Sequence, residues 1–545
     1  MNKVGDKFAV EKEIIKELCS PKRTKCGGAT LYFHNAIGYV NNSEGHTNIL
    51  GGSGMGKSRR MSYQTCASVL NNKESLIAVD PKGELYKYTA CYAEENHQLI
   101  CIDFRNLLYS VRWNPLHLIT VLYHSGNPED KERAEAILDE LSHNLYPAPE
   151  NQDPFWIQSA RSVFIGVVHA LLDFAEPEEI NICNVYNFIA TGEERFGAST
   201  YLKEFVNMLP KDSVESMLLL GYVTTASDTK AGIRSVFLEG LSLFVRSEGL
   251  KRFTSYSDLK IDELLGDKPV AIYIIIPDES PVYDDLAGVL VSQLLTHFIS
   301  IAQNKYDGVL PCRLNILLEE LGNIGKAISN LPHLMSAGRS RNIRIYMILQ
   351  SLSQLKDIYG ESKTETILGN VSTTVAFSCN NYDTLERFSN ICGSRYIKVD
   401  KVNQKEPLIT ASQLGAMEIG QALIILNGRL RYITKLPDYE EVYKNVKLMK
   451  PINEKTHDDI SVRYFDLQKL VKEMKRKEMD TKDARDSLRA PFNPFRDRNG
   501  DMEDIDAVIA RIDREIAKLE AEEKEAEKEK EKEKKKPGRK KKEEE

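Results

Sequence analysis

The stretch GGSGMGKS, residues 51–58, constrains the fold of this 545-residue chain more than any other. It matches the phosphate-binding loop pattern of Gly, four residues, Gly, Lys and Ser or Thr. Glycines let backbone N–H groups wrap a phosphate chain, while Lys57 is expected to meet the β and γ phosphates and Ser58 to ligate Mg²⁺. A strand-like run precedes the loop and a helical run follows it. The pattern therefore predicts an ATP and Mg²⁺ site, formed by Gly51, Gly52, Ser53, Gly54, Met55, Gly56, Lys57 and Ser58.

The composition fits a folded protein without a uniformly basic surface. Apolar residues make up 42% of the chain and charged residues 28%, and the formal net charge is -7. Phosphate binding draws on clustered Lys and Arg, so this balance argues against a nucleic-acid coat but leaves a local basic surface or channel open. The nine cysteines show no CxxC pair and no zinc-finger spacing, which argues against a metal site built from them and fits a reducing cytoplasm.

No secretion signal and no membrane span are expected. The N-terminus mixes charged and apolar residues and lacks an uninterrupted apolar core. The longest uncharged run, residues 286–304, is long enough to test as a span, but its Ser, Thr, Gln and His residues favour a buried helix. We therefore expect a cytoplasmic protein.

Strand-like apolar runs separated by helical segments predict an α/β fold with a mostly parallel sheet. After the loop, such runs lie at residues 75–80, 98–103, 269–277, 314–319, 343–350, 373–378 and 421–426. Strand signals are scarce between residues 120 and 265, which predicts an all-α domain inserted into the sheet domain. Because the functional edge of a parallel sheet is at the carboxyl ends of its strands, we look for site residues there.

Seven ranges organise the chain in this interpretation. They are an N-terminal segment (1–47), a nucleotide-binding domain in two parts (48–119 and 266–450), the inserted all-α domain (120–265), a linker region (451–500), an amphipathic or coiled-coil helix (501–520) and a charged disordered tail (521–545). The helix prediction rests on three- and four-residue steps between apolar side chains. These are Met502, Ile505, Ile509, Ile512, Ile516 and Leu519. We expect this helix to dock on a partner or a neighbouring subunit.

Two adjacent carboxylates end the apolar run in LNILLEELGNIG, residues 314–325. A phosphate-binding loop needs an acidic site on a neighbouring strand, to hold the metal and to orient the attacking water. We expect Glu319 at the metal-side position and Glu320 as the general base. Asp80 and Asp103 also end strand-like runs; Asp80 is retained as a nucleotide-site candidate because the turn that follows it, Pro-Lys-Gly, is distinctive, whereas Asp103 is more simply a strand exit.

Three further residues are candidates for sensing or stabilising the transferred phosphate. Gln350 ends the run IRIYMILQ, where its amide is in a position to sense the γ phosphate or the water. Arg339 and Arg341 precede that run, where one could reach a nucleotide in an adjacent subunit as an arginine finger. A solvated helix end is the alternative interpretation of both arginines.

Five pieces of sequence, in order, make residues 48–443 resemble TraG/TraD-type coupling proteins of type IV secretion and conjugation systems. They are GGSGMGKS, VDPKGELY, RWNPL, EELGNIG and the stretch that begins GRSRNI and continues through LQSLSQLKDIYG to ILGN. The resemblance implies a RecA-like ATPase, hexameric when active, at the cytoplasmic face of the membrane. Such a protein feeds a relaxase bound to single-stranded DNA into a secretion channel, alongside the channel ATPases, and its all-α domain engages substrate. By motif match, Lys57 and Ser58 contact phosphate and metal, Glu320 is the catalytic acid and Gln350 the sensor.

The chain departs from that family pattern in two respects, which keep other functions open. Family members usually begin with transmembrane helices, so a separate membrane-anchoring subunit or a soluble variant is expected here. The usual metal-side aspartate is replaced by Glu319. The alternatives are an FtsK/HerA-like translocase of double-stranded DNA and a nucleotide-gated substrate adaptor with little ATP turnover.

Overall fold

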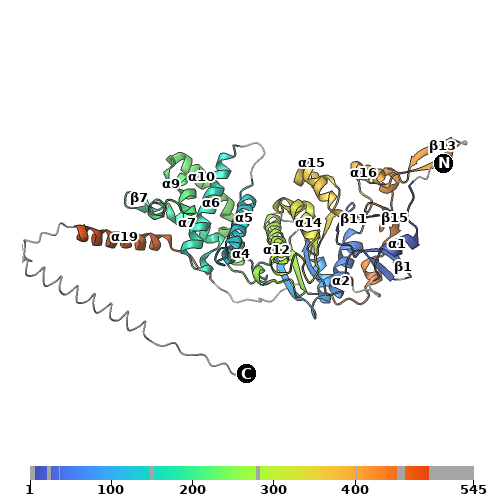
Figure 1. Ribbon diagram of the computed structural model, residues 1–545, viewed down its shortest axis with the longest axis horizontal. Coiled ribbons are helices and arrows are strands. Elements are labelled where there is room, and N and C mark those ends of the chain that lie inside the picture. The colour runs from blue at the N-terminus through green and yellow to red at the C-terminus, as the bar shows by residue number, and fades with distance from the viewer. Residues whose placement is uncertain are drawn as a thin grey trace, which may run out of the picture. The chain divides into compact units, whose positions relative to one another are not determined.

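The computed structural model in Figure 1 describes residues 6–20, 26–35, 37–147, 153–277, 283–399, 402–450 and 461–489. Its chain divides into two units, Met1–Val471 and Lys472–Glu545. The predicted helix at 501–520 and the tail at 521–545 lie outside the described residues. The first unit contains the sheet, the helical region and every residue of the site described below.

A nine-stranded sheet in the order β15-β14-β11-β3-β10-β9-β4-β8-β5 organises the first unit. Every pair from β11 to β5 is parallel, whereas β14 and β15 are antiparallel additions at one edge. The strands are β3 (His46–Leu50), β4 (Ser75–Asp80), β5 (Gln98–Asp103), β8 (Val270–Ile275), β9 (Leu314–Leu318), β10 (Ile343–Leu349), β11 (Val371–Ala376), β14 (Gln421–Leu426) and β15 (Leu430–Lys435). The strands from before the helical region, β3, β4 and β5, are interleaved with strands from after it, so both parts of the chain build one RecA-like α/β domain.

The central strands are buried along their whole length because they are covered on both faces. Every residue of β3, β4, β8, β9 and β10 is buried. The helices of this domain are α2 (Tyr63–Asn71), α3 (Glu84–Thr89), α12 (Asp284–Lys305), α13 (Leu321–Ile324), α14 (Leu331–Arg339), α15 (Ser353–Gly369), α16 (Tyr382–Cys392), α17 (Ala411–Gly415) and α18 (Tyr439–Val442). Between the phosphate-binding loop and α2 lies a π-helical turn, η1 (Ser58–Ser62).

The region between β5 and β8 is helical apart from one two-stranded ladder, β6 (Arg195–Phe196) with β7 (Ser199–Thr200). Its helices are α4 (His117–Tyr123), α5 (Pro128–Leu145), α6 (Phe155–Phe174), α7 (Ile182–Gly192), α8 (Tyr201–Met208), α9 (Val214–Thr224), α10 (Ser227–Arg246) and α11 (Glu248–Ser255). The apolar helix α6 lies among α5, α7, α9 and α10. Figure 1 shows this helical region beside the sheet domain rather than on a face of the sheet.

Hydrogen bonds join the helical region to the sheet domain through α12 and the segment after β9. Ser292 on α12 donates to Glu140 Oε1 at 2.7 Å. The Asn144 side chain on α5 donates to the Ala327 carbonyl at 3.2 Å. Gly288 of α12 packs so closely on that segment that an added Cβ would meet the Ala327 Cβ at 2.5 Å. The helical region is therefore in contact with the stretch that follows the two carboxylates of β9.

Among the described residues, two helices are long and apolar enough to cross a membrane, α6 and α12. Both pack inside the protein, with 56% and 67% of their most apolar windows buried. The expected buried helix at residues 286–304 corresponds to α12.

Several elements of the structure were not predicted from the sequence. The segment 1–47 contains α1 (Glu11–Glu17) and the hairpin of β1 (Thr30–His34) with β2 (Ile37–Val40). A second hairpin pairs β12 (Ser394–Val399) with β13 (Val402–Pro407). The range 451–500, expected to be a linker, contains α19 (Leu467–Arg489). Leu467 and Val471, at the start of α19, are fully buried, so this part of the range is anchored on the folded unit.

Candidate nucleotide-binding site

Four parallel strands bring the phosphate-binding loop, the two adjacent glutamates and Gln350 to one edge of the sheet. Leu50 at the end of β3 pairs with Leu349 of β10, and Leu318 at the end of β9 pairs with both Met347 of β10 and Val79 of β4. The residues that follow these positions therefore leave the sheet together. Because β10 lies between β3 and β9, Gln350 emerges between the phosphate-binding loop and the two carboxylates.

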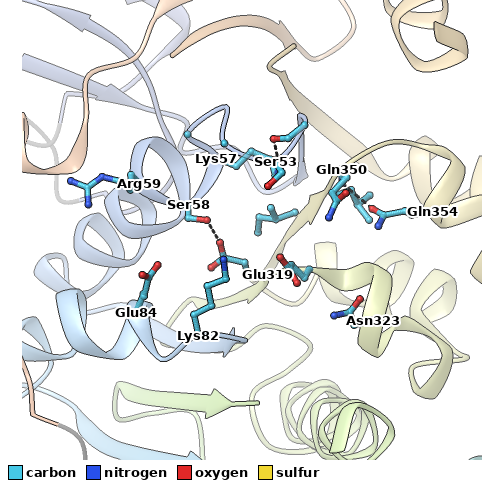
Figure 2. A pocket seen from close by; sticks show the side chains of 16 residues that line it. Ser53, Lys57, Ser58, Arg59, Lys82, Glu84, Glu319, Asn323, Gln350 and Gln354 are labelled. Atoms are coloured by element: carbon cyan, nitrogen blue, oxygen red, sulfur yellow. Dashed lines mark hydrogen bonds between the residues drawn. The ribbon is translucent and has the colours of Figure 1, made fainter. Parts of the chain in front are cut away.

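These strand ends surround the pocket drawn in Figure 2. Its lining is formed by Gly52, Ser53, Gly54, Gly56, Lys57, Ser58, Arg59, Lys82, Glu84, Glu319, Glu320, Asn323, Ile348, Leu349, Gln350 and Gln354. Most of the predicted loop residues are in this set. Gly51 and Met55 are not; Gly51 instead lies against Phe377 of the neighbouring strand end, where an added Cβ would approach the Phe377 Cβ to 2.7 Å.

The phosphate-binding loop has the backbone that its glycines permit. Gly54 and Gly56 adopt φ angles of 78° and 91°, a region that other residues rarely occupy. The Lys57 ammonium donates to the carbonyls of Gly51, at 2.5 Å, and Gly52, at 3.0 Å. Burial lowers the pKa of Lys57, against the nearby charges of Glu319 and Glu320, which raise it. The lysine is thus held over the loop, where an anion would stabilise its charged form.

Ser58 and Glu319 provide two oxygen ligands side by side. The Ser58 hydroxyl donates to Glu319 Oε1, as the dashed line in Figure 2 marks. Glu319 is only 8% exposed, and burial raises its pKa to about 8, with a further contribution from the charge of Asp80. Mg²⁺ takes oxygen ligands and commonly uses one or two protein groups together with substrate phosphates. The pair fits such an ion, because it presents a hydroxyl oxygen and a carboxylate oxygen side by side in the pocket. No cluster of three or more His, Cys, Asp or Glu side chains suited to a metal occurs in the described ranges.

Glu320 lies in the same pocket in a strained backbone conformation. Its φ and ψ angles are 53° and 48°, the left-handed region that costs a non-glycine residue roughly 1–3 kcal/mol. This conformation turns the chain from β9 into α13 and places the carboxylate on the pocket wall. Within the described part of the chain, no hydrogen bond engages that carboxylate. The two adjacent acids therefore have different surroundings, one buried against Ser58 and one open to the pocket.

The amides of Gln350 and Gln354 form the wall opposite Lys82 in Figure 2. Gln350 follows β10 directly, and its backbone N–H donates to Gln354 Oε1 at 2.9 Å. Gln354 thereby fixes the backbone from which the Gln350 side chain extends. Gln350 was predicted from the sequence as a site residue, whereas Gln354, one helical turn further along, was not.

The structure brings neither Asp80 nor Asp103 to the pocket lining. Asp80 is 1% exposed, and its carboxylate accepts the Tyr86 N–H at 2.9 Å, so it caps the turn into α3. Burial raises the pKa of Asp80 to about 6. Asp103 accepts two hydrogen bonds from the Arg105 guanidinium, at 3.0 and 3.1 Å. Both aspartates hold the loops beneath the pocket.

Arg339 and Arg341 lie at the opposite edge of the sheet from the pocket of their own chain. They precede β10, which is seven residues long and therefore spans roughly 20 Å. Arg341 donates to the Ala337 carbonyl at 2.7 Å and to Gln303 Oε1 at 3.2 Å. Arg339 is exposed at the end of α14. Neither arginine can reach the nucleotide site of its own subunit.

Comparison with known proteins places the chain in a family. Residues 2–428 match the model of the type IV secretory system conjugative DNA transfer family. The chain belongs to this family. The match runs from before β1 to the end of β14 and contains the whole helical region, so it includes every residue that lines the pocket.

Relatives of this chain have low sequence identity to it but a similar fold. Protein VirD4 of Rhizobium radiobacter is 23% identical over 390 residues, covering 69% of this chain and 52% of that protein. The chain thus spans about half the length of the curated relatives it matches. A structure of plasmid coupling protein TrwB in complex with the ATP analogue ADPNP has a TM-score of 0.61 and 16% identity, covering 82% of this chain and 96% of TrwB. The structure of TrwB in complex with ADP and Mg²⁺ has a TM-score of 0.59 and 16% identity, covering 80% of this chain and 94% of TrwB. These likenesses confirm the RecA-like fold.

Several residues that line the pocket were not predicted from the sequence. They are Arg59, Lys82, Glu84, Asn323 and Gln354. Lys82 and Glu84 belong to VDPKGELY, which follows β4, the strand next to β9. Arg59 directly follows the loop, and Asn323 is three residues after Glu320. The only sequence signal for these five residues was that most of them lie close in sequence to predicted site residues. That they line one cavity follows only from the arrangement of neighbouring strand ends in the sheet.

Proposed function

We propose that this chain binds ATP with Mg²⁺ in the pocket of Figure 2 and hydrolyses it. The supporting observation is that Lys57, Ser58, Glu319, Glu320 and Gln350, which are far apart in sequence, converge on one cavity at the carboxyl edge of the sheet. When bound, Mg²⁺ would neutralise phosphate charge from a site on Ser58 and Glu319. The TrwB structures carry ADPNP in one case and ADP with Mg²⁺ in another, which supports the same ligands here.

Three side chains of the pocket have definite roles in this proposal. Lys57 leaves the carbonyls of Gly51 and Gly52 and donates to the β and γ phosphates. The Glu320 carboxylate, free of hydrogen bonds within the described ranges, accepts a proton from the attacking water and orients it. Gln350 contacts the water or the γ phosphate from its position between the loop and the carboxylates. Arg339 or Arg341 would act only on the nucleotide of a neighbouring subunit.

We further propose that ATP turnover drives the delivery of a substrate to a type IV secretion channel. The substrate would be a relaxase bound to single-stranded DNA, and the all-α region, residues 120–265, would engage it. The family match supports this function, and the arginines at the far edge of the sheet support a ring, in our proposal a homo-hexamer. Its place would be the cytoplasmic face of the membrane, beside the channel ATPases and held by a separate membrane-anchoring subunit.

One observation favours a second candidate, a nucleotide-gated adaptor with little turnover. Glu319 replaces the usual aspartate, and with a pKa of about 8 it must lose a proton near neutral pH before it can ligate a metal. Weaker metal binding at neutral pH would limit hydrolysis while leaving nucleotide binding intact. An FtsK/HerA-like translocase of double-stranded DNA is a further motor of the same fold class.

The test is ATP hydrolysis by the full-length protein with single-stranded DNA, with duplex DNA and without DNA, at low and moderate salt. A coupling protein is expected to be stimulated by single-stranded DNA, with stimulation falling as salt rises because the contacts are to phosphate. Stimulation by duplex DNA alone would favour the translocase. Nucleotide binding without DNA-stimulated turnover would favour the adaptor. Retention of a relaxase by the immobilised protein then tests substrate recruitment.

A further inference from the structure

Three cations line the nucleotide pocket, and two of them already have partners. Lys57 donates to the loop carbonyls of Gly51 and Gly52. Arg59 is bound to Asp438 through Nε at 3.0 Å and Nη2 at 2.7 Å, and Nη2 also lies 3.0 Å from Glu440. Lys82 is different, because no hydrogen bond or ion pair within the described ranges engages its ammonium. The pocket therefore contains one cation whose charge is available to a ligand.

The backbone that carries Lys82 is held firmly from two strand ends. Arg105, anchored on the Asp103 carboxylate at the end of β5, donates from Nη1 to the Lys82 carbonyl at 3.1 Å. The next residue, Gly83, has a φ of 71° and lies against the same guanidinium, which an added Cβ would meet at 2.6 Å. The turn is closed on its other side by the Asp80 carboxylate, which accepts the Tyr86 N–H. Such a turn fixes the Lys82 Cα while leaving the end of its side chain free.

The side chain extends into the space that a terminal phosphate would occupy. Figure 2 shows Lys82 reaching from its loop toward Glu319 and the Ser58 end of the phosphate-binding loop. Lys57 lines the same pocket, so the ammonium groups of two lysines share one cavity. Two like charges that face one cavity repel each other, and a bound polyanion would relieve that repulsion. Beside a metal-binding pair and a general base, the matching anion is a nucleoside triphosphate.

We propose that Lys82 contacts the terminal phosphate of bound ATP and stabilises the charge that spreads over it during hydrolysis, an inference that rests on the ATPase activity proposed above. In the step concerned, the water oxygen bonds to the γ phosphorus as a water proton passes to Glu320. The bond from the γ phosphorus to the β–γ bridging oxygen breaks, and its electron pair leaves with ADP. Lys82 keeps its proton throughout. It supplies in its own subunit a positive charge that Arg339 and Arg341, at the opposite edge, cannot supply there.

The test compares Lys82→Ala, Lys82→Arg and the control Lys87→Ala in the full-length protein. Lys87 is an exposed lysine on α3, its ammonium 5.4 Å from the Tyr88 ring centroid and outside the pocket lining. Lys82→Ala is expected to lower kcat for ATP roughly 10- to 100-fold, because it removes one preorganised charge at the developing anion. It should weaken a non-hydrolysable ATP analogue roughly 5- to 10-fold while ADP affinity stays within about twofold, since only the analogue carries a terminal phosphate. Lys82→Arg, which keeps the charge, should retain more hydrolysis than Lys82→Ala.

Several results would show that Lys82 does not contact the terminal phosphate, while leaving the proposed ATPase function intact. They are an unchanged kcat in Lys82→Ala, an equal loss of ADP and analogue affinity, an equal effect of Lys87→Ala, or no advantage of arginine over alanine. An equal loss for both nucleotides would mean that the substitution disturbs the turn as a whole. Failure of the proposed function looks different, because the wild-type protein would then neither hydrolyse ATP nor bind the analogue.

Discussion

Glu319 and Glu320 are adjacent in the chain but lie in different surroundings, and that difference predicts different defects. Glu320→Gln should lower kcat at least about 100-fold with ATP still bound, because it removes the base but leaves the metal pair. Glu319→Gln should instead raise the Mg²⁺ concentration needed for half-maximal activity. Titrating Mg²⁺ into both variants, with bound nucleotide counted in parallel, separates the two effects. A larger loss of the chemical step in Glu319→Gln would reverse the two roles.

Asp80 should have a measurable effect on stability that depends on pH. A carboxyl whose pKa rises from 3.8 when exposed to about 6 when buried binds protons more tightly in the folded state. The free energy of unfolding therefore falls as pH rises from 3.8 to 6 and stays lower above 6, by up to about 3 kcal/mol. Asp80→Asn keeps an oxygen to accept the Tyr86 N–H and should remove this dependence. Denaturation of both proteins at pH 5 and pH 7.5 tests it; an Asn variant less stable than wild type at pH 7.5 would contradict it.

At the level of residues, sequence alone predicted most of the residues of the phosphate-binding loop that line the pocket, together with both glutamates and Gln350. The phosphate-binding loop, the carboxylate pair and Gln350 all have a pattern or a strand end that marks them. Lys82 and Gln354 do not, because their roles depend on which strand ends are neighbours. Asp80 shows the opposite error: a distinctive turn indicated a site residue, but the carboxylate points into its own turn and caps it.

At the level of elements, the helix α12 packs closely against residues 324–327, in the segment that follows the two carboxylates. An added Cβ at Gly288 would meet the Ala327 Cβ at 2.5 Å and the Ile324 carbonyl at 2.8 Å. Gly288→Ala should therefore destabilise the protein by about 1–3 kcal/mol and slow hydrolysis by displacing the segment after Glu320. The control is Gly221→Ala on α9, where nothing lies within 4 Å of the added Cβ, so helix propensity favours it. Thermal melting and ATPase rates measure both; equal behaviour of the two variants would count against this role of α12.

Apolar runs predicted the sheet well, because central strands buried on both faces have an unmistakable composition. The elements that were missed lack that signal. The only sequence signal for β15 was the Asn-Gly pair of the turn before it. Asn427 and Gly428 both have positive φ angles, a conformation that this pair favours. α19 is rich in Lys, Glu and Arg, so its apolar density is low, and within residues 467–479 its buried side chains are Leu467 and Val471. A search for hairpin turns would have found β15; α19 required the tertiary contacts.

At the level of the whole molecule, the chain returns from the sheet domain to the helical region before it enters α19. The Asn184 side chain donates to the Arg463 carbonyl at 2.9 Å and accepts the Phe465 N–H at 3.1 Å. The Phe465 ring stacks on Phe188 with centroids 5.9 Å apart, and Leu467 and Val471 are buried. Residues 461–471 thus complete the apolar surface of α7.

Two truncations separate this anchoring segment from the C-terminal residues beyond it. Removing residues 461–545 should destabilise the helical region by roughly 3–6 kcal/mol, since two buried aliphatic side chains are lost. Removing residues 501–545 should leave melting and basal ATPase activity unchanged and weaken partner recruitment. Thermal melting and relaxase retention distinguish the two. If the shorter deletion unfolded the protein, residues 501–545 would have a structural role, which would contradict this prediction.

The central claim, that the pocket at the carboxyl edge of the sheet binds and hydrolyses ATP, is tested most directly by one comparison. ATP hydrolysis and ATP-analogue binding are measured for the full-length wild-type protein and for Lys57→Ala, in Mg²⁺ and single-stranded DNA. The side chain serves phosphate rather than the core, so the variant should melt like the wild type without nucleotide. It should also fail to bind the ATP analogue, and its rate of ATP hydrolysis should fall at least about 100-fold. Hydrolysis at the wild-type rate in Lys57→Ala would contradict the account.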